Sequence, residues 1–288
     1  MKALVFGEVI WDVYPDKKVI GGAPFNFAAH LSHLGMEAYL ITGVGDDDLG
    51  SEALAQMEKH GVKTDFVVTN TFDTGKCTVT LDENKIPSYY VHTNTAYDNI
   101  TADEKLIEKI KALNPDVFYF NTLIQRNEVS RSSLKYILEN CNFKDIFCDI
   151  NIRKECFDYD SLKLCMEKST IVKISDEEAH YLYDLGLVKG NDIIKDVAVA
   201  FPNLKQVVFT RGGDGSCVLD TQSDKLYDSG KLPKTKVVST VGAGDCYGAT
   251  YIAYILGKNA TIDEAIDAAS KRSAIVVSSL EAVPFTDF

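Results

Sequence analysis

The stretch Thr240-Val241-Gly242-Ala243-Gly244-Asp245-Cys246-Tyr247-Gly248-Ala249 joins a glycine-rich turn to an apolar run that continues through Leu256. Gly242 and Gly244 permit a tight backbone path in which successive N–H groups converge on one point. Because the apolar run predicts a helix, that point lies at a helix start, where free N–H groups and the helix dipole favour an anion. The stretch therefore predicts an anion-binding turn.

Asp245 is expected on the first turn of this helix, beside the anion. A carboxylate repels an anion, but it can take a proton from a hydroxyl that attacks a phosphoryl group. The alternative is a plain glycine-rich turn in which Asp245 only stabilises the helix start. Taken alone, the stretch does not decide between a catalytic base and a residue of the helix terminus.

Length and composition narrow the function classes. A chain of 288 residues can bury a large core, and 45% apolar with 25% charged residues is ordinary for a globular protein. The net charge of −12 argues against nucleic acid and anionic membranes as partners. No apolar run approaches a membrane span, no signal peptide is visible, and seven scattered cysteines without a C-x-x-C pair fit a reducing compartment. The expected location is the cytoplasm.

The order of the predicted elements indicates the fold class. Strands alternate with helices along most of the chain, which predicts one α/β domain over 1–288 with a doubly wound, mostly parallel central sheet flanked by helices. Two segments outside this alternation, about 13–20 and 75–95, alternate polar and apolar residues like strands, and a turn is expected at 82–85. These segments predict a separate small sheet.

A second group of polar residues and glycines lies near the start of the chain. A buried strand is predicted over 3–10, and Asp12 follows just beyond its carboxyl end, where ligands bind in open α/β sheets. A carboxylate there can accept hydrogen bonds from several hydroxyl groups of a polar substrate, although a solvated loop aspartate is the alternative. Asn26 lies in the first turn of a helix predicted over 25–34, and its amide can bond a hydroxyl or cap the helix. Gly21 and Gly22 let the backbone approach a ligand closely.

Three motifs in this order resemble one known family. The stretch 239–245 is similar to the C-terminal signature of the ribokinase-like (PfkB) sugar kinases, and 7–12 (G-E-V-I-W-D) and 21–28 (G-G-A-P-F-N-F-A) resemble its sugar-binding region. The sequences of the motifs at 7–12 and 21–28 are most similar to the fructokinase branch of this family. The resemblance extends over essentially the whole chain and implies ATP-dependent phosphorylation of a sugar hydroxyl, with fructose expected. Ribose, a keto-deoxy sugar acid or a nucleoside is the nearer alternative, and a non-catalytic sugar-binding module is the more distant one.

The resemblance also implies roles for individual residues. Asp245 would be the catalytic base, and the turn Gly242-Ala243-Gly244 would hold the phosphate charge. The sugar would be held by Asp12, Gly21, Gly22, Asn26 and Arg153, the last of which matches the end of a D-x-N-x-R motif. The nucleotide would contact Thr210, Gly212, Gly215 and Gly242. A surface ion pair for Arg153 and a plain hairpin for 210–215 stay open as alternatives.

The cations and the assembly follow from the same resemblance. Glu178 matches the last position of an N-x-x-E motif near Mg²⁺, but Ser175 replaces the asparagine, which leaves the details of the ion's shell open. Ser239 replaces an aspartate that helps to form a monovalent-cation site in the family, so the need for potassium is left open. The small sheet would act as a lid, and pairing of two lids predicts a symmetric homodimer.

Overall fold

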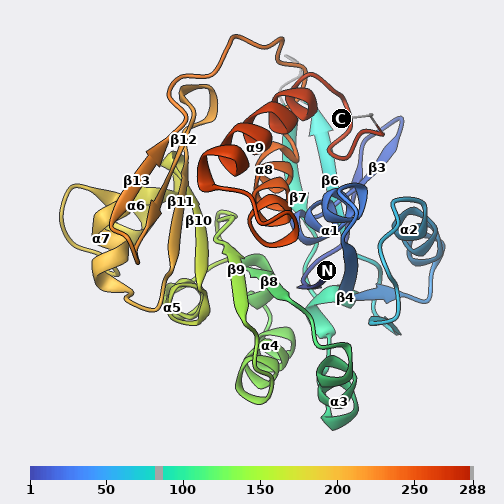
Figure 1. Cartoon of the computed structure of the whole chain (residues 1–288). Coiled ribbons are helices and arrows are strands. Elements are labelled where there is room, and N and C mark those ends of the chain that lie inside the picture. The colour runs from blue at the N-terminus through green and yellow to red at the C-terminus, as the bar shows by residue number, and fades with distance from the viewer. Residues whose placement is uncertain (82–86, 286–288) are drawn as a thin grey trace.

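The computed structural model describes residues 1–81 and 87–285, which form one large and one small sheet (Figure 1). The turn expected at 82–85 lies outside the described residues. The large sheet has the strand order β13-β12-β11-β10-β9-β8-β1-β4-β5. Its strands are β1 (Lys2–Phe6), β4 (Glu37–Gly45), β5 (Val67–Asn70), β8 (Val117–Asn121), β9 (Asp145–Asp149), β10 (Ile171–Ser175), β11 (Gln206–Thr210), β12 (Ser216–Asp220) and β13 (Lys225–Asp228).

Strand direction confirms the α/β prediction. From β5 to β11 every neighbouring pair is parallel, and β12 and β13 add an antiparallel edge. Parallel strands are buried on both faces, which explains why β8 (Val-Phe-Tyr-Phe-Asn) is apolar almost throughout. The carboxyl ends of the parallel strands therefore lie along one edge of the sheet, where a ligand site is expected.

Helices cover both faces of the large sheet (Figure 1). One face is covered by α3 (Glu104–Leu113), α4 (Glu128–Asn140), α5 (Tyr159–Lys168), α6 (Asp176–Asp184) and α7 (Ile193–Ala200). The other is covered by α1 (Ala23–His33), α2 (Asp48–Lys59), α8 (Ala243–Ile252) and α9 (Ile262–Val277). The helix predicted from the C-terminal glycine-rich stretch continues beyond α8 as a π-helical segment, Ala253–Gly257.

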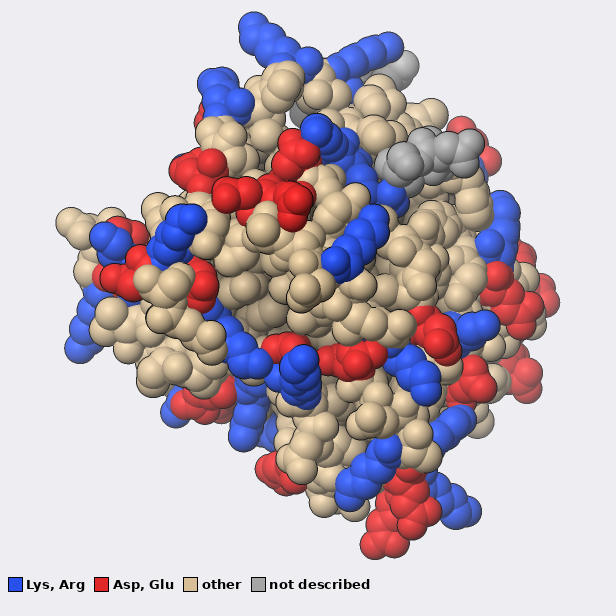
Figure 2. Space-filling model, in the orientation of Figure 1, with Lys and Arg blue, Asp and Glu red and all other residues tan. Residues whose placement is uncertain are grey.

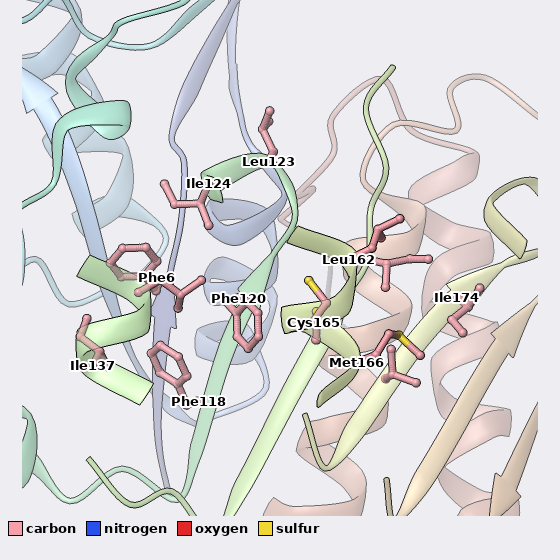
Figure 3. Packing of buried hydrophobic residues seen from close by; sticks show 14 of the residues in the cluster. Phe6, Phe118, Phe120, Leu123, Ile124, Ile137, Leu162, Cys165, Met166 and Ile174 are labelled. Atoms are coloured by element: carbon pink, nitrogen blue, oxygen red, sulfur yellow. The ribbon is translucent and has the colours of Figure 1, made fainter. Parts of the chain in front are cut away.

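Two apolar cores follow from these layers. On the first face, residues of the sheet pack against residues of α4 and α5, as Figure 3 shows for Phe118 beside Ile137 of α4 and for Ile174 beside Met166 of α5. On the second face, Phe27 of α1 stacks on Tyr119 and Phe147 of the sheet at centroid distances of 4.2 and 5.4 Å. The second core fixes α1 and α8 against the same strands, and these two helices carry the residues of the site.

The small sheet begins earlier in the chain than the sequence predicted, at Ile10 instead of about residue 13. Its order is β3-β2-β6-β7, with β2 (Ile10–Val13), β3 (Lys18–Gly21), β6 (Lys76–Leu81) and β7 (Pro87–Val91). The prediction of one strand over 3–10 was wrong, because β1 ends at Phe6 and the chain leaves the large sheet at Gly7-Glu8. Asp12 therefore lies within β2 of the small sheet, rather than in a loop beyond the large one.

The described residues contain no helix that is long and apolar enough to cross a membrane. On the face shown in Figure 2, lysines and arginines are interspersed with aspartates and glutamates.

Candidate active site

The glycine-rich turn begins α8 as predicted. Gly242 is the N-cap residue with φ of 79°, a left-handed conformation that favours glycine. A Cβ at this position would lie 2.6 Å from the Cβ of Ala282, so the C-terminal segment packs directly on the turn. Ala243 donates its N–H to the Thr240 carbonyl at a long 3.3 Å, and Gly244 is exposed at the surface. The turn thus combines an open helix start with a backbone path that only glycine adopts easily.

Asp245 lies on the first turn of α8 and faces α1. Its Oδ2 accepts a hydrogen bond of 2.8 Å from Asn26 Nδ2, whereas the buried Asn26 Oδ1 has no partner within the part of the chain that the structure describes. Burial raises the pKa of Asp245, and the bond from Asn26 and the charges of Lys173 and Arg153 oppose that rise. The free Asn26 oxygen can accept a hydrogen bond from a hydroxyl beside the carboxylate. The structure therefore brings together two residues that are 219 positions apart in the sequence.

The small sheet brings the remaining N-terminal residues to the same edge. Asp12 in β2 pairs with Val19 across one strand and with Cys77 across the other. Burial raises the pKa of Asp12, and the charge of Arg153 lowers it. Gly21 lies next to the Asp12 carboxylate, since a Cβ on Gly21 would be 3.7 Å from Asp12 Oδ2. Because glycine has no side chain, it does not cover this oxygen.

Gly22 connects the small sheet to α1. It is the N-cap residue of α1 with φ of 104°, and a Cβ there would lie 2.7 Å from the Glu8 carbonyl oxygen. Its own carbonyl accepts the N–H of Asn26 at 2.9 Å. A glycine is required here because the chain turns sharply against the backbone that leaves β1.

Arg153 is exposed, and its charge acts on several acids of the site. Burial raises the pKa of Glu8, Asp12 and Asp245, and the charge of Arg153 opposes that rise in each case. Among residues 1–81 and 87–285, Arg153 forms no ion pair. An exposed guanidinium whose charge reaches these three carboxyl groups can hold an anionic or hydroxylated ligand.

The second glycine-rich turn joins β11 to β12 at the same edge of the sheet. Thr210 ends β11 and pairs with Ser216, so the segment is a hairpin in its backbone. Gly212 and Gly215 have φ of 52° and 90°, and a Cβ on Gly215 would contact the Gly230 carbonyl. This turn lies one strand beyond β10, on the side of the sheet away from Asp12.

Glu178 stabilises the chain locally. Its Oε1 accepts the N–H of Ile152 at 2.7 Å and its Oε2 accepts the N–H of Ser175 at 2.9 Å, within the capping box of α6. Within residues 1–81 and 87–285 no group of three or more acidic, histidine or cysteine side chains could hold a metal ion. A single nearby carboxylate such as Glu178 fits Mg²⁺ that is held mainly by phosphates and water, because Mg²⁺ keeps several waters and needs few protein ligands.

Four further polar residues of this edge were missed by the sequence predictions. Lys173 Nζ lies 2.7 Å from Asp149 Oδ2, and both side chains are buried. Glu8 accepts two hydrogen bonds from Asn121 Nδ2 at 3.1 and 3.2 Å, and burial raises the pKa of Glu8 to about 7. A signal was present, because Lys173 and Glu8 interrupt otherwise apolar strand-like runs, where a charged residue needs a partner.

The geometry defines a class of protein: an α/β protein with a buried carboxylate at an open helix start, and with polar residues of a small sheet at the same edge. The model of the pfkB family of carbohydrate kinases matches residues 3–286. The chain therefore belongs to the pfkB family of carbohydrate kinases.

Individual relatives agree with this assignment. A protein of Arabidopsis thaliana named "Probable fructokinase-5" is 25% identical over 315 residues, covering 97% of this chain and 92% of that protein. A protein of Pyrococcus horikoshii named "Putative sugar kinase PH1459" is 28% identical over 258 residues, covering 85% of this chain and 76% of that protein. Its crystal structure in complex with ATP has a TM-score of 0.81 and covers 98% of this chain and 94% of that one, at 22% identity. The 2-dehydro-3-deoxygluconokinase of Thermotoga maritima has a TM-score of 0.85 at 20% identity, covering 99% and 96%.

Proposed function

We propose that the chain transfers the γ-phosphoryl group of ATP to a hydroxyl of fructose. The observation that carries the proposal is the bond between Asn26 and Asp245, since it holds a sugar-binding amide and a basic carboxylate side by side at the open start of α8. Asp12, Gly21 and Gly22 would bind the other sugar hydroxyls from the small sheet, and Arg153 would lie across the pocket from them.

The reaction follows from these positions. The sugar hydroxyl gives its proton to a carboxylate oxygen of Asp245 as its own oxygen bonds to the γ-phosphorus. The bond between that phosphorus and the β,γ-bridging oxygen breaks, and ADP leaves with the electron pair. N–H groups at the start of α8, around Gly242, Ala243 and Gly244, stabilise the negative charge on the equatorial oxygens.

The nucleotide would lie along the turn that joins β11 to β12, against Thr210, Gly212, Gly215 and Gly242. Mg²⁺ would neutralise phosphate charge, with Glu178 behind its water shell. The charge of Glu178 acts on both Asp149 and Lys173, which supports a place near the phosphates.

Fructose as the substrate is supported by the sequence motifs at 7–12 and 21–28 and by the fructokinase relative. A 2-keto-3-deoxy sugar acid is the second candidate, because a deoxygluconokinase shares the fold and the exposed Arg153 could hold a carboxylate. Fructose, ribose and nucleosides carry no such carboxylate, so this group distinguishes the sugar acid from the other three.

The test is sugar-dependent ADP release across a panel of fructose, ribose, 2-keto-3-deoxygluconate and a nucleoside, at matched concentrations. We expect fructose to give a kcat/KM at least tenfold higher than each of the others, because a site that bonds particular hydroxyls rejects analogues that lack them, by about tenfold or more. Arg153→Gln is the matched variant: it should lower turnover of the sugar acid more than that of fructose. A higher kcat/KM for the sugar acid in wild type would overturn the assignment to fructose, and no turnover with any sugar would overturn the kinase.

A further inference from the structure

Lys173 is a buried cation to which the proposed reaction assigns no role. It lies in the middle of β10 between the buried apolar residues Val172 and Ile174, and its side chain is 6% exposed. Its Nζ is 2.7 Å from Oδ2 of Asp149, the residue that the sheet register places beside it in β9. Removing both charges from water opposes folding, and a buried ion pair is often no more stable than apolar residues of the same volume. Stability alone is a weak explanation for this pair.

The ammonium lies directly beneath the first turn of α8. A Cβ placed on Gly244 would lie 3.3 Å from Lys173 Nζ, so nothing separates the cation from the backbone of the turn. The start of a helix carries the positive end of its dipole. Two positive features therefore lie side by side, an unfavourable arrangement unless negative charge is held on the open side of the turn.

Asp149 fixes the position of the lysine ammonium. Its Oδ2 holds Nζ from below, and its other oxygen, Oδ1, is buried and has no hydrogen-bond partner among the described residues. Burial raises the pKa of Asp149 to about 6, with the charge of Lys173 opposing the rise. The negative charge in best position to respond to Lys173 on the ligand side of the turn is the carboxylate of Asp245, one residue beyond Gly244.

We propose that Lys173 is a positioning residue of the phosphoryl transfer: Asp149 aims its ammonium at the first turn of α8, where it keeps Asp245 ionised and ready to take the proton of the attacking hydroxyl. The inference rests on the proposed function, because it assigns Lys173 a part in the same site. Without the lysine, Asp245 would hold its own proton at a higher pH and could not accept another.

Other groups around Asp245 also influence its ionisation. Burial of Asp245 favours the protonated form, and the hydrogen bond from Asn26 favours the ionised form. The charged or titratable groups that interact with it come from the segment after β1, from β8, from β9 and the loop after it, from β10 and from α8 itself: Glu8, Tyr119, Asp149, Arg153, Lys173 and Cys246. Lys173 is the buried cation in this set, so water screens its charge least.

The test measures the pH profile of kcat/KM for fructose in three variants. Lys173→Met keeps the length of the side chain and removes the charge, and Lys173→Met with Asp149→Asn also removes the carboxylate left unpaired. Lys205→Met is the control, because Lys205, just before β11, forms a comparable ion pair of 2.7 Å with Oδ1 of Asp145 at the opposite end of β9 from Asp149. We expect the acid limb to move up by about one pH unit in both Lys173 variants, with kcat/KM at pH 6 reduced by about tenfold. The limb should stay in place in Lys205→Met.

A second readout does not need turnover. The ¹³C carboxyl signal of Asp245, assigned with Asp245→Asn, can be titrated in the ligand-free protein. We expect it to titrate at higher pH in the double variant than in wild type, and a titration at the same pH would show that Lys173 serves only the packing of β10 and would overturn the inference. Absence of ADP release from wild type with every sugar would instead overturn the proposed function, so the two failures are distinguishable.

Discussion

Asn26 Nδ2 donates a hydrogen bond of 2.8 Å to Asp245 Oδ2 and so joins the first turn of α1 to the first turn of α8. Both turns follow a glycine in a left-handed or positive-φ conformation, Gly22 before α1 and Gly242 before α8. Two helix starts thus converge on one point, and each contributes free N–H groups there. A hydroxyl bound by Asn26 is held beside the carboxylate that would take its proton.

The first prediction concerns Asn26. Asn26→Ala removes a hydrogen bond to a charged group and should lower kcat/KM by about 10–100-fold. The bond from Asn26 lowers the pKa of Asp245, so the acid limb of the profile should also move to higher pH. Steady-state kinetics from pH 5 to 8 measure both effects. Asn140→Ala, on the exposed side of α4, is the control, and an Asn26 variant that behaves like it would contradict the assigned role.

The second prediction concerns potassium. Ser239 carries no charge, and its Oγ already accepts the N–H of Val241 at 3.2 Å, within the turn that precedes α8. A neutral hydroxyl engaged in this way holds a monovalent cation more weakly than a carboxylate. We expect turnover to differ by less than about twofold between potassium and a bulky organic cation at matched ionic strength, because a neutral ligand set binds the ion little.

Ser239→Asp is the matched variant for potassium. It should introduce activation by potassium but not by the organic cation. Strong potassium activation of wild type that the substitution leaves unchanged would show that Ser239 has no influence on a cation site.

The third prediction concerns assembly. The small sheet ends in the edge strands β3 and β7, and Tyr90 of β7 is 62% exposed. Edge strands and exposed aromatic residues of a small sheet favour pairing with a second copy. We expect light scattering at micromolar concentration to give a dimer, and Tyr90→Glu to give a monomer. A wild-type monomer with and without fructose and ATP would contradict the lid-to-lid dimer.

The fourth prediction concerns stability in acid. His30 is buried, its Nε2 bonds the Ala282 carbonyl at 2.9 Å, and burial lowers its pKa to about 3. An unfolded histidine takes up a proton near pH 6.5, so the stability that His30 contributes is complete above that pH and is lost as the pH falls below it. The loss should approach about 1.4 kcal/mol per pH unit between pH 6 and 4.

Urea unfolding at several pH values measures this slope. Arg272, His33 and His60 face His30 and make its protonation less favourable still. His30→Gln keeps a donor for the Ala282 carbonyl but cannot be protonated, and it should flatten the dependence of the free energy of unfolding on pH. An equal slope in wild type and variant would place the acid sensitivity elsewhere.

The large sheet and its helices could be predicted from the sequence because periodic apolar runs report burial directly. The helix predicted over 25–34 is α1 within two residues at each end, and the helix start after Gly242 is as expected. The boundary near Gly7-Glu8 was mispredicted, because Val9 and Ile10 continue the apolar run into the small sheet. Apolar residues buried under two different sheets look alike in one sequence.

The site was predictable only where short motifs carry it. Asp245, Asn26 and Asp12 stand in such motifs, whereas the contacts of Lys173 with Asp149 and of Glu8 with Asn121 depend on which strands become neighbours. Strand order is set by tertiary packing, which local patterns do not report. The charge in the middle of β10 indicated that a partner exists, but not which residue it is.

Comparison of Asp245→Asn with wild type tests the central claim most directly. Asparagine keeps the size of the side chain and cannot accept the proton of the sugar hydroxyl, so kcat should fall by about 10²–10⁴-fold. Fructose binding, followed by calorimetry with a non-hydrolysable ATP analogue, should change by less than about threefold, because the base contributes mainly in the transition state. A kcat within tenfold of wild type would contradict the account of Asp245 as the base.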